Sequence, residues 1–309
     1  MKNNLVTIAI PAYKADFIQD AIYSALNQTY PNIELVVVDD NSPENIEEIV
    51  QKINDSRIRY YRNEKNIGAE DPSQNWNKCL QYARGDFFAL LCDDDTYESN
   101  FIEEMLKLKL EFPNVAVFRA RAKVIDENNN IVNWYPSLPK FETCIDYMYQ
   151  KMSGYRRQTI SEFFYDTQYI KKLGGYVNTP RAWTADALSI YTFAWENGIA
   201  STQSILVNFR NSGKNISSTN KDALKKREAL FLYQQKINQF IHQINDSNYK
   251  KILQKALYYS MFCEIKGLCS QASFFNIFRI LIKGGFPRSW ILFIIPEKIG
   301  VIWQRFAKK

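Results

Sequence analysis

Apolar residues in the first 120 positions form short, nearly uninterrupted runs, separated by segments of helical periodicity. The runs occupy residues 5–10, 33–38, 58–61, 87–91 and 115–118. In the segment after the first run, apolar side chains recur at positions that share one helix face, namely Phe17, Ala21, Ile22, Ala25 and Leu26. Because the runs lack the alternation of half-exposed strands, they predict an α/β fold with a mostly parallel central sheet and flanking helices.

Turn and capping residues predict where several elements begin or end. Ser42 and Asp71 each precede a proline, which predicts a helix start with a capping side chain at both places. The three asparagines at 128–130 predict a hairpin tip. Farther along, residues 184–196 have the pattern of a helix, and residues 204–210 that of a strand.

The pattern changes after about residue 220. Apolar positions recur at helical spacing over residues 230–244 and again over 252–268, which predicts two amphipathic helices. The sequence therefore predicts an α/β domain over residues 1–220 and a helical C-terminal region over residues 221–309.

The formal net charge of +6 is concentrated at the end of the chain. Residues 271–309 contain one acid, Glu297, and seven bases, Arg279, Lys283, Arg288, Lys298, Arg305, Lys308 and Lys309. The preceding 270 residues thus hold equal numbers of acidic and basic side chains. Nucleic-acid-binding surfaces are basic, so this balance argues against a nucleic-acid partner for the main body.

The basic tail is also rich in aromatic residues, with Phe274, Phe275, Phe278, Phe286, Trp290, Phe293, Trp303 and Phe306. Its longest apolar stretch, 290–295, is far shorter than the ~20 residues of a membrane span. Such a composition is typical of a helix lying on an anionic membrane surface. The alternative, in which these aromatics pack on the body as ordinary core, stays open at this point.

The cysteines and the N-terminus bear on the compartment. Five cysteines form no C-x-x-C pair, and His242 is the only histidine, which nearly excludes a zinc site of the Cys/His kind. The apolar run at residues 5–10 is too short for a signal peptide. We therefore expect a cytoplasmic protein, peripheral to the inner face of the cell membrane if the tail binds lipid.

Carboxylates follow two of the predicted strands. Asp39 and Asp40 come after the second, and Asp93, Asp94 and Asp95 after the fourth. In a parallel sheet these strand ends share one edge, so the carboxylates should converge there. Crowded carboxylates favour a cation, and a site without histidine suits Mg²⁺ or Mn²⁺ holding a diphosphate. Glycine-rich phosphate loops are missing from the sequence, so the metal would have to bind the phosphates.

Three blocks of sequence, residues 6–45, 66–95 and 173–198, resemble the inverting family 2 glycosyltransferases of bacterial polysaccharide synthesis. The resemblance covers roughly residues 4–218. It implies the GT-A fold and the transfer of a sugar from a nucleotide-diphosphate donor, with a UDP-sugar expected. The acceptor implied is a hydroxyl of a saccharide, often lipid-linked, and the class is hexosyl- or N-acetylhexosaminyltransferase.

The first two blocks imply the nucleotide site. Pro11, Ala12 and Tyr13 would lie along the base and ribose, with Asp40 accepting a hydrogen bond from the uracil ring and Asp39 supporting the turn. Asn66 resembles a residue of the family's nucleotide-side loop.

The family's D-x-D motif maps onto residues 92–95, with a departure from the usual pattern. Cys92 stands where the first aspartate usually is, so the contact of that aspartate must pass to Asp93. Asp94 occupies the metal-ligand position, with Asp95 in support, and the cofactor implied is Mn²⁺ or Mg²⁺.

The third block implies the catalytic base. Asp186 matches a carboxylate at the start of a late helix, which would remove the acceptor proton. A following loop resembles a segment that closes over the donor diphosphate, where Arg210 and Lys214 are candidate phosphate ligands. Donor specificity is expected from side chains of the middle region, among them Arg157, Gln158, Glu162 and Trp183.

Other functions compete with this interpretation. A response-regulator receiver also has an acidic pair, but after its first strand and in a chain less than half as long. A nucleotidyltransferase that makes an activated sugar would need bases near the first strand, where Lys14 stands alone. A relative that binds donor without transferring the sugar remains a third alternative.

Overall fold

The structure, a computed structural model, describes residues 4–213 and 222–270. Three sequence-based predictions, those for Lys214, for the boundary near residue 220 and for the basic tail, lie outside these residues. The strands are β1 Val6–Ala12, β2 Ile33–Asp39, β3 Ile58–Arg62, β4 Phe87–Leu90, β5 Thr96–Tyr97, β6 Val117–Ile125, β7 Ile131–Trp134, β8 Phe141–Glu142, β9 Phe163–Asp166 and β10 Ile199–Arg210. The α-helices are α1 Ile18–Leu26, α2 Ile46–Lys52, α3 Ser73–Tyr82, α4 Phe101–Glu111, α5 Cys144–Met152, α6 Thr167–Lys172, α7 Ala185–Ala194, α8 Ala223–Gln243 and α9 Ser247–Ser270.

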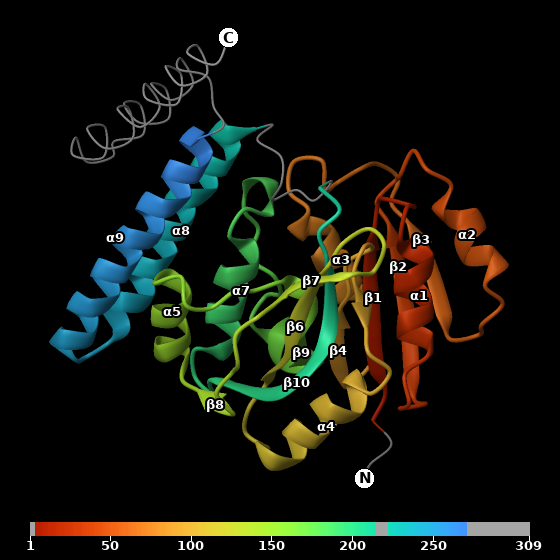
Figure 1. Cartoon of the computed structure of the whole chain (residues 1–309), viewed down its shortest axis with the longest axis horizontal. Helices are drawn as coiled ribbons and strands as arrows, with labels where there is room; N and C mark the ends of the chain where they lie inside the picture. The colour runs from red at the N-terminus through yellow and green to blue at the C-terminus, as the bar shows by residue number, and fades with distance from the viewer. Residues whose placement is uncertain (1–3, 214–221, 271–309) are drawn as a thin grey trace.

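The strands form one sheet in the order β3-β2-β1-β4-β9-β6-β10-β5, with β7 paired to β6 and β8 to β10. The first four strands of this order are parallel, and the predicted parallel arrangement holds there. Beyond β4 the sheet is mixed, because β9 runs antiparallel to both β4 and β6 while β10 is parallel to β6. In Figure 1 helices flank this sheet, as the apolar runs predict.

Both faces of the sheet are buried, each in its own core. Along β2, Leu35 and Val37 pack with α1, α2 and α4, whereas Val36 and Val38 pack on the opposite side with α3, α5 and α7. All seven residues of β2 are buried. A strand with apolar contacts on both faces favours apolar residues at successive positions, which explains the run from Leu35 to Val38.

Several predicted elements are confirmed and one helix start is wrong. The structure contains the predicted hairpin at residues 128–130 and the two predicted C-terminal helices. The helix predicted over residues 184–196 is α7. The helix expected at Ser42 begins instead at Ile46, with Asn45 as its cap. The Ser42 hydroxyl donates to the Tyr13 carbonyl at 2.6 Å and accepts from the Glu44 N–H at 3.0 Å, so it belongs to the turn after β2.

Helices α8 and α9 lie side by side at one end of the molecule (Figure 1). Their buried side chains, such as Leu230, Ile237 and Leu257, share a core with Tyr191 of α7 and Met148 of α5. The C-terminal helices are therefore packed against the α/β body, and a division into separate regions at residue 220 stays a prediction. In the described parts of the chain, no helix combines the length and apolarity needed to cross a membrane.

Candidate active site

The carboxyl ends of β1, β2 and β4 lie at one edge of the sheet, because β1 pairs in parallel with both neighbours. The segments that follow these strands are joined across that edge. The Asp93 carboxylate, after β4, accepts hydrogen bonds from the backbone N–H groups of Tyr13 at 2.9 Å and Lys14 at 2.8 Å. The Asp40 N–H donates to the Ala12 carbonyl at 2.9 Å. The fold thus brings together the predicted residues of the three strand ends.

Asp39 and Asp40 have different roles at the end of β2. The Asp39 carboxylate is fully buried and accepts from the Ser42 N–H at 2.7 Å, as expected of a residue that supports the turn. Asp40 faces the loop before α3, where its carboxylate accepts from the N–H groups of Ile67 at 2.9 Å and Gly68 at 2.7 Å. A Cβ on Gly68 would lie 2.6 Å from Asp40 Oδ2, so this close approach requires glycine.

The same loop brings Asn66 close to Asp40, because a Cβ on Gly68 would lie near the side chains of both residues. The Asn66 Oδ1 atom is buried and receives no hydrogen bond from any of the described residues. A buried acceptor without a donor is costly, and a ligand N–H or O–H, or a water molecule, would satisfy it. Tyr13, on the other side of the β2 end, is 41% exposed and can offer its ring to a ligand.

The predicted metal residues differ in their surroundings. The Asp94 carboxylate lies 2.6 Å from Lys14 Nζ, and Asp93 Oδ1 lies 3.6 Å from the same nitrogen. Desolvation lowers the pKa of Lys14, but the charges of Asp93 and Asp94 outweigh it and raise the pKa above its ordinary value. In this structure Lys14 supplies the positive charge that the carboxylates require.

Asp95 is held more deeply. Its Oδ1 accepts from the Arg210 N–H at 2.9 Å and its Oδ2 from the Ser161 hydroxyl at 2.6 Å. Desolvation and the negative charge of Asp94 raise the pKa of Asp95 to about 8. One ligand atom from each of Cys92, Asp94 and Asp95 lies within 4.8 Å of the other two.

This donor set fits a hard divalent ion better than zinc. Burial, reinforced by the nearby carboxylates, raises the pKa of the Cys92 thiol well above its ordinary value, so the thiolate that zinc prefers is disfavoured at this position. The carboxylates of Asp94 and Asp95 then remain as oxygen donors, the ligands that Mg²⁺ and Mn²⁺ prefer. Asp94 is the better candidate, because its Oδ2 is bound by Lys14 Nζ, a cation that a metal ion can replace, whereas the Asp95 oxygens are bound by Ser161 and by the Arg210 backbone.

Arg210 does not face a ligand, contrary to the sequence-based expectation. Its side chain is fully buried, with Nε donating to the Asp94 carbonyl at 2.9 Å and Nη1 to Asn129 Oδ1 at 2.8 Å. The guanidinium also lies 4.2 Å from the centre of the Phe17 ring. These contacts fix the metal motif to the β6–β7 turn and leave Arg210 unavailable to a phosphate.

Asp186 lies in the first turn of α7. Its Oδ2 accepts a hydrogen bond from Gln158 Nε2 at 2.8 Å. The segment before α7 is held from α9, because the Trp183 indole N–H donates to Glu264 at 3.2 Å. The C-terminal helices therefore help to place the predicted catalytic base.

Two residues of the middle region have different surroundings from those the sequence suggested. Glu162, expected near the donor sugar, is fully buried and forms an ion pair with Arg119 at 2.7 Å. Gln158 contacts Asp186 instead. Sequence reasoning missed these pairings because nothing in the spacing of the residues indicates them.

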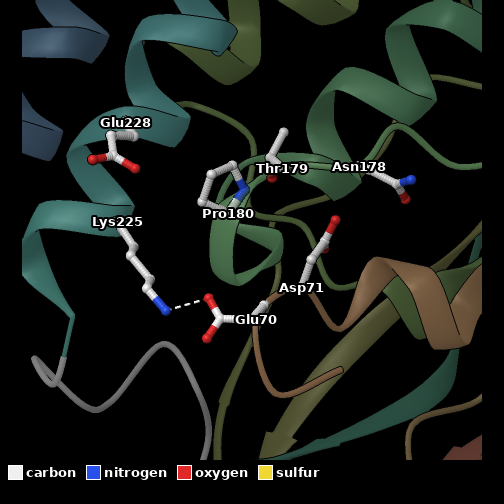
Figure 2. Close-up of a pocket in the computed structure, with 7 residues that line it drawn as sticks. All are labelled: Glu70, Asp71, Asn178, Thr179, Pro180, Lys225 and Glu228. Carbon is white, nitrogen blue, oxygen red and sulfur yellow. Dashed lines mark hydrogen bonds and ion pairs between the residues drawn. The ribbon is translucent and has the colours of Figure 1, made fainter. Parts of the chain in front are cut away.

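A pocket of about 330 Å³ lies between the loop before α3, the segment before α7 and the start of α8 (Figure 2). It is lined by Glu70, Asp71, Asn178, Thr179, Pro180, Lys225 and Glu228. Lys225 forms an ion pair with Glu70 across it, and the Arg181 N–H donates to the Glu70 carbonyl at 2.7 Å. The loop that carries Asn66 thus touches both the segment leading to Asp186 and the C-terminal helices.

Comparison with known proteins identifies the family. Residues 7–167 match the model of glycosyl transferase family 2. Over 133 residues the chain is 38% identical to the UDP-Glc:alpha-D-GlcNAc-diphosphoundecaprenol beta-1,3-glucosyltransferase WfgD of Escherichia coli, an alignment covering 43% of this chain and 51% of WfgD. TuaG of Bacillus subtilis, named for teichuronic acid biosynthesis, is 34% identical over 110 residues, 35% of this chain and 42% of TuaG. The matches thus span about half the length of these curated relatives.

Solved structures give the same fold. Residues 1–349 of TarS from S. aureus superpose with a TM-score of 0.67 at 18% identity, covering 91% of this chain and 80% of that one. The TarS complex with UDP-GlcNAc superposes with a TM-score of 0.64 at 17% identity, covering 86% and 81%. At this identity the likeness shows the GT-A fold alone. The family model matches more than half of the chain, which therefore belongs to glycosyl transferase family 2.

Proposed function

We propose that the protein transfers a sugar from a UDP-sugar to a hydroxyl of a lipid-linked saccharide, with inversion at the anomeric carbon. The observation that carries this proposal is the joining of two sites by one short segment. Asp94 stands at the sheet edge and Asp186 lies in the first turn of α7. Within residues 158–161, Gln158 bonds to Asp186 and Ser161 bonds to Asp95, the neighbour of Asp94. A donor diphosphate and an attacking hydroxyl could then meet between them.

The donor nucleotide would lie along Pro11, Ala12 and Tyr13, with its base near Asp40 and Asn66. The Asn66 Oδ1 atom supports this placement, because it lacks a hydrogen-bond donor among the residues that the structure describes and a nucleotide can supply one. The Asp93 carboxylate would accept a hydrogen bond from a ribose hydroxyl, in addition to those from the backbone N–H groups of Tyr13 and Lys14. Uracil is the base we expect, since TarS is described with UDP and UDP-GlcNAc and WfgD is named for UDP-Glc.

Asp94, with Asp95 in support, would hold Mn²⁺ or Mg²⁺. When bound, such an ion neutralises negative charge that develops on a diphosphate leaving group. Lys14 occupies the neighbourhood of Asp94 in the free protein and would share or yield this position when the ion and the donor bind.

Asp186 would act as the general base. Its carboxylate accepts the proton of the acceptor hydroxyl while that oxygen forms a bond to the anomeric carbon, and the bond from this carbon to the diphosphate breaks. Attack on the face opposite the leaving group inverts the configuration. A positioned base of this kind contributes about 10²- to 10⁴-fold to the rate.

The acceptor we propose is a lipid-linked saccharide. WfgD is named for a diphosphoundecaprenol-linked acceptor, which supports a lipid-linked saccharide for this chain as well. Such a substrate would place the enzyme at the inner face of the cell membrane, and the basic, aromatic composition of residues 271–309 is compatible with that location.

The proposal is tested by incubating the enzyme with a panel of UDP-sugars, Mn²⁺ and a lipid extract that contains polyprenyl-linked saccharides. We expect one donor to release UDP only when the extract is present, and the labelled sugar to appear in the lipid fraction. An Asp94→Asn variant should bind Mn²⁺ more weakly and transfer more slowly. Release of pyrophosphate from a nucleoside triphosphate and a sugar phosphate would identify a nucleotidyltransferase, and donor binding without UDP release would identify a non-catalytic relative.

A further inference from the structure

The segment of residues 157–162 connects the metal motif to the segment of the catalytic base. At one end, the Ser161 hydroxyl donates to Asp95 Oδ2 at 2.6 Å and accepts from the Cys92 N–H at 3.1 Å. At the other end, Gln158 Nε2 donates to Asp186 Oδ2 at 2.8 Å. The metal motif, through Asp95, and the proposed base, Asp186, are thus held by side chains of one short segment of the chain.

This segment is anchored from the interior. Arg119, on β6, donates to the Arg157 carbonyl at 2.5 Å and to Glu162 at 2.8 Å, and its side chain is 1% exposed. The Arg119 guanidinium also lies 5.4 Å from the ring centre of Tyr147. Breaking a buried ion pair is strongly unfavourable, so the backbone that carries Gln158 has little freedom to move.

The orientation of the Gln158 amide is determined by its two partners. The hydroxyl of Tyr147, a fully buried residue of α5, donates to Gln158 Oε1 at 2.5 Å. The opposite amide orientation would place Oε1 against the Asp186 carboxylate, where two acceptors would face each other. Nε2 must therefore point to Asp186, and it binds one of the two carboxylate oxygens.

We propose that Gln158 is a positioning residue that holds the carboxylate of Asp186 in the orientation needed to accept the acceptor proton. With Oδ2 bound to Gln158, the rotation of the carboxylate is restricted and Oδ1 can face the hydroxyl. This inference rests on the proposed role of Asp186 as the base. It replaces the sequence-based expectation that Gln158 selects the donor sugar.

The test compares Gln158→Met, which keeps the length of the side chain but removes the amide, with Gln158→Glu and Tyr147→Phe. Gln254→Met, at an exposed position of α9, is the matched control. Gln158→Met should lower kcat about 10- to 100-fold, because a misplaced group costs that much. The KM for the donor should not change. Tyr147→Phe removes only the hydrogen bond to Gln158 Oε1 and leaves the bond from Nε2 to Asp186. It should therefore lower kcat by a smaller factor.

Two further readouts distinguish positioning from a general structural role. Gln158→Glu introduces a carboxylate next to Asp186, and repulsion should move the acidic limb of the kcat profile to higher pH. In the Asp186→Asn background, Gln158→Met should cause no further loss, because a residue that acts through Asp186 has nothing left to position.

The outcomes separate this inference from the proposed function. If Asp186→Asn is inactive while Gln158→Met has a normal kcat and pH profile, the positioning role is wrong and the base assignment stands. A raised donor KM with unchanged kcat would instead make Gln158 a donor-specificity residue. Normal transfer by Asp186→Asn would overturn the base assignment itself. If Gln158→Met fails to fold, as judged by thermal unfolding, Gln158→Glu and Tyr147→Phe decide the question.

Discussion

Lys14 is the residue whose surroundings most directly link the metal motif to the first strand. Its ammonium group is partly buried between Asp93 and Asp94, and its backbone N–H is bound by Asp93 as well. In the free protein this cation offsets charge that would otherwise be unpaired and desolvated. A divalent ion at Asp94 would take over that function.

We predict that Lys14→Met destabilises the metal-free protein by about 1.5–3 kcal/mol, the usual contribution of a hydrogen bond to a charged group. Added Mn²⁺ should then raise the midpoint of thermal unfolding more in the variant than in the wild type, because no ammonium group competes for Asp94. Calorimetry with and without Mn²⁺ measures both quantities. An equal Mn²⁺ shift in the two proteins would mean that Lys14 and the ion do not share a site.

The burial of Glu162 predicts how the stability of the protein depends on pH. Burial raises the pKa of Glu162 to about 7, against the opposing effect of the Arg119 guanidinium, from an ordinary value of 4.5. Between these two pH values the folded protein therefore holds more protons than the unfolded chain. The stability that protonation of Glu162 contributes is complete below about pH 4.5 and is lost as the pH rises through about 7.

Urea unfolding of the wild type and of Glu162→Gln between pH 5 and pH 8 checks this. Relative to the variant, which cannot ionise at this position, the wild type should lose stability as the pH rises. Parallel stability curves would show that Glu162 does not titrate in this range.

Some residues of the candidate site are marked by the sequence immediately around them, whereas others are identified only by contacts with residues distant in the chain. Asp94 and Asp186 are candidates from the sequence alone, because each stands in a recognisable block of sequence, after a strand or at the start of a helix. The bonds of Gln158 to Asp186 and of Arg119 to Glu162 could not, since the partners are 28 and 43 positions apart in the chain. Only the packing of α7, β6 and the segment before β9 brings them together.

At the scale of elements, β1, β2, β3, β4 and β6 were predictable because these strands contain nearly continuous apolar runs, whereas the short strands β5, β8 and β9 were not predicted. The start of α2 was not, because Ser42 has the chemistry of a helix cap but bonds to the turn after β2. The position of α8 and α9 against α5 and α7 was also hidden, since an amphipathic pattern shows that a face is buried and not what covers it.

Because α8 shares a core with the α/β body, a substitution on its buried face should destabilise the whole protein. An exposed position on the same helix serves as the control. Leu230 is fully buried and Leu232 is 41% exposed, two positions along. Leu230→Ala should destabilise the whole protein by about 2–5 kcal/mol, whereas Leu232→Ala should change stability by less than about 0.5 kcal/mol. Because the helices and the body share one core, a single cooperative unfolding transition is expected in both. Two separate transitions, of which Leu230→Ala shifts only that of the C-terminal helices, would show that these helices fold independently.

At the scale of the whole molecule, charge and chemistry are separated along the chain. The carboxylates of the proposed site belong to a body with balanced charge, whereas the net charge of +6 belongs to residues 271–309. If this basic segment binds membrane, its deletion should abolish sedimentation with vesicles that contain anionic lipid and leave UDP-sugar binding unchanged. Undiminished sedimentation would place the membrane contact elsewhere.

The proposed mechanism depends most on Asp186 being the base. The most direct test is the rate of UDP release with Mn²⁺, the preferred UDP-sugar and its acceptor, for the wild type and for Asp186→Asn, whose amide keeps the shape of the side chain. We predict that kcat falls by about 10²- to 10⁴-fold while binding of the UDP-sugar is retained. Transfer by Asp186→Asn at the wild-type rate would contradict the mechanism.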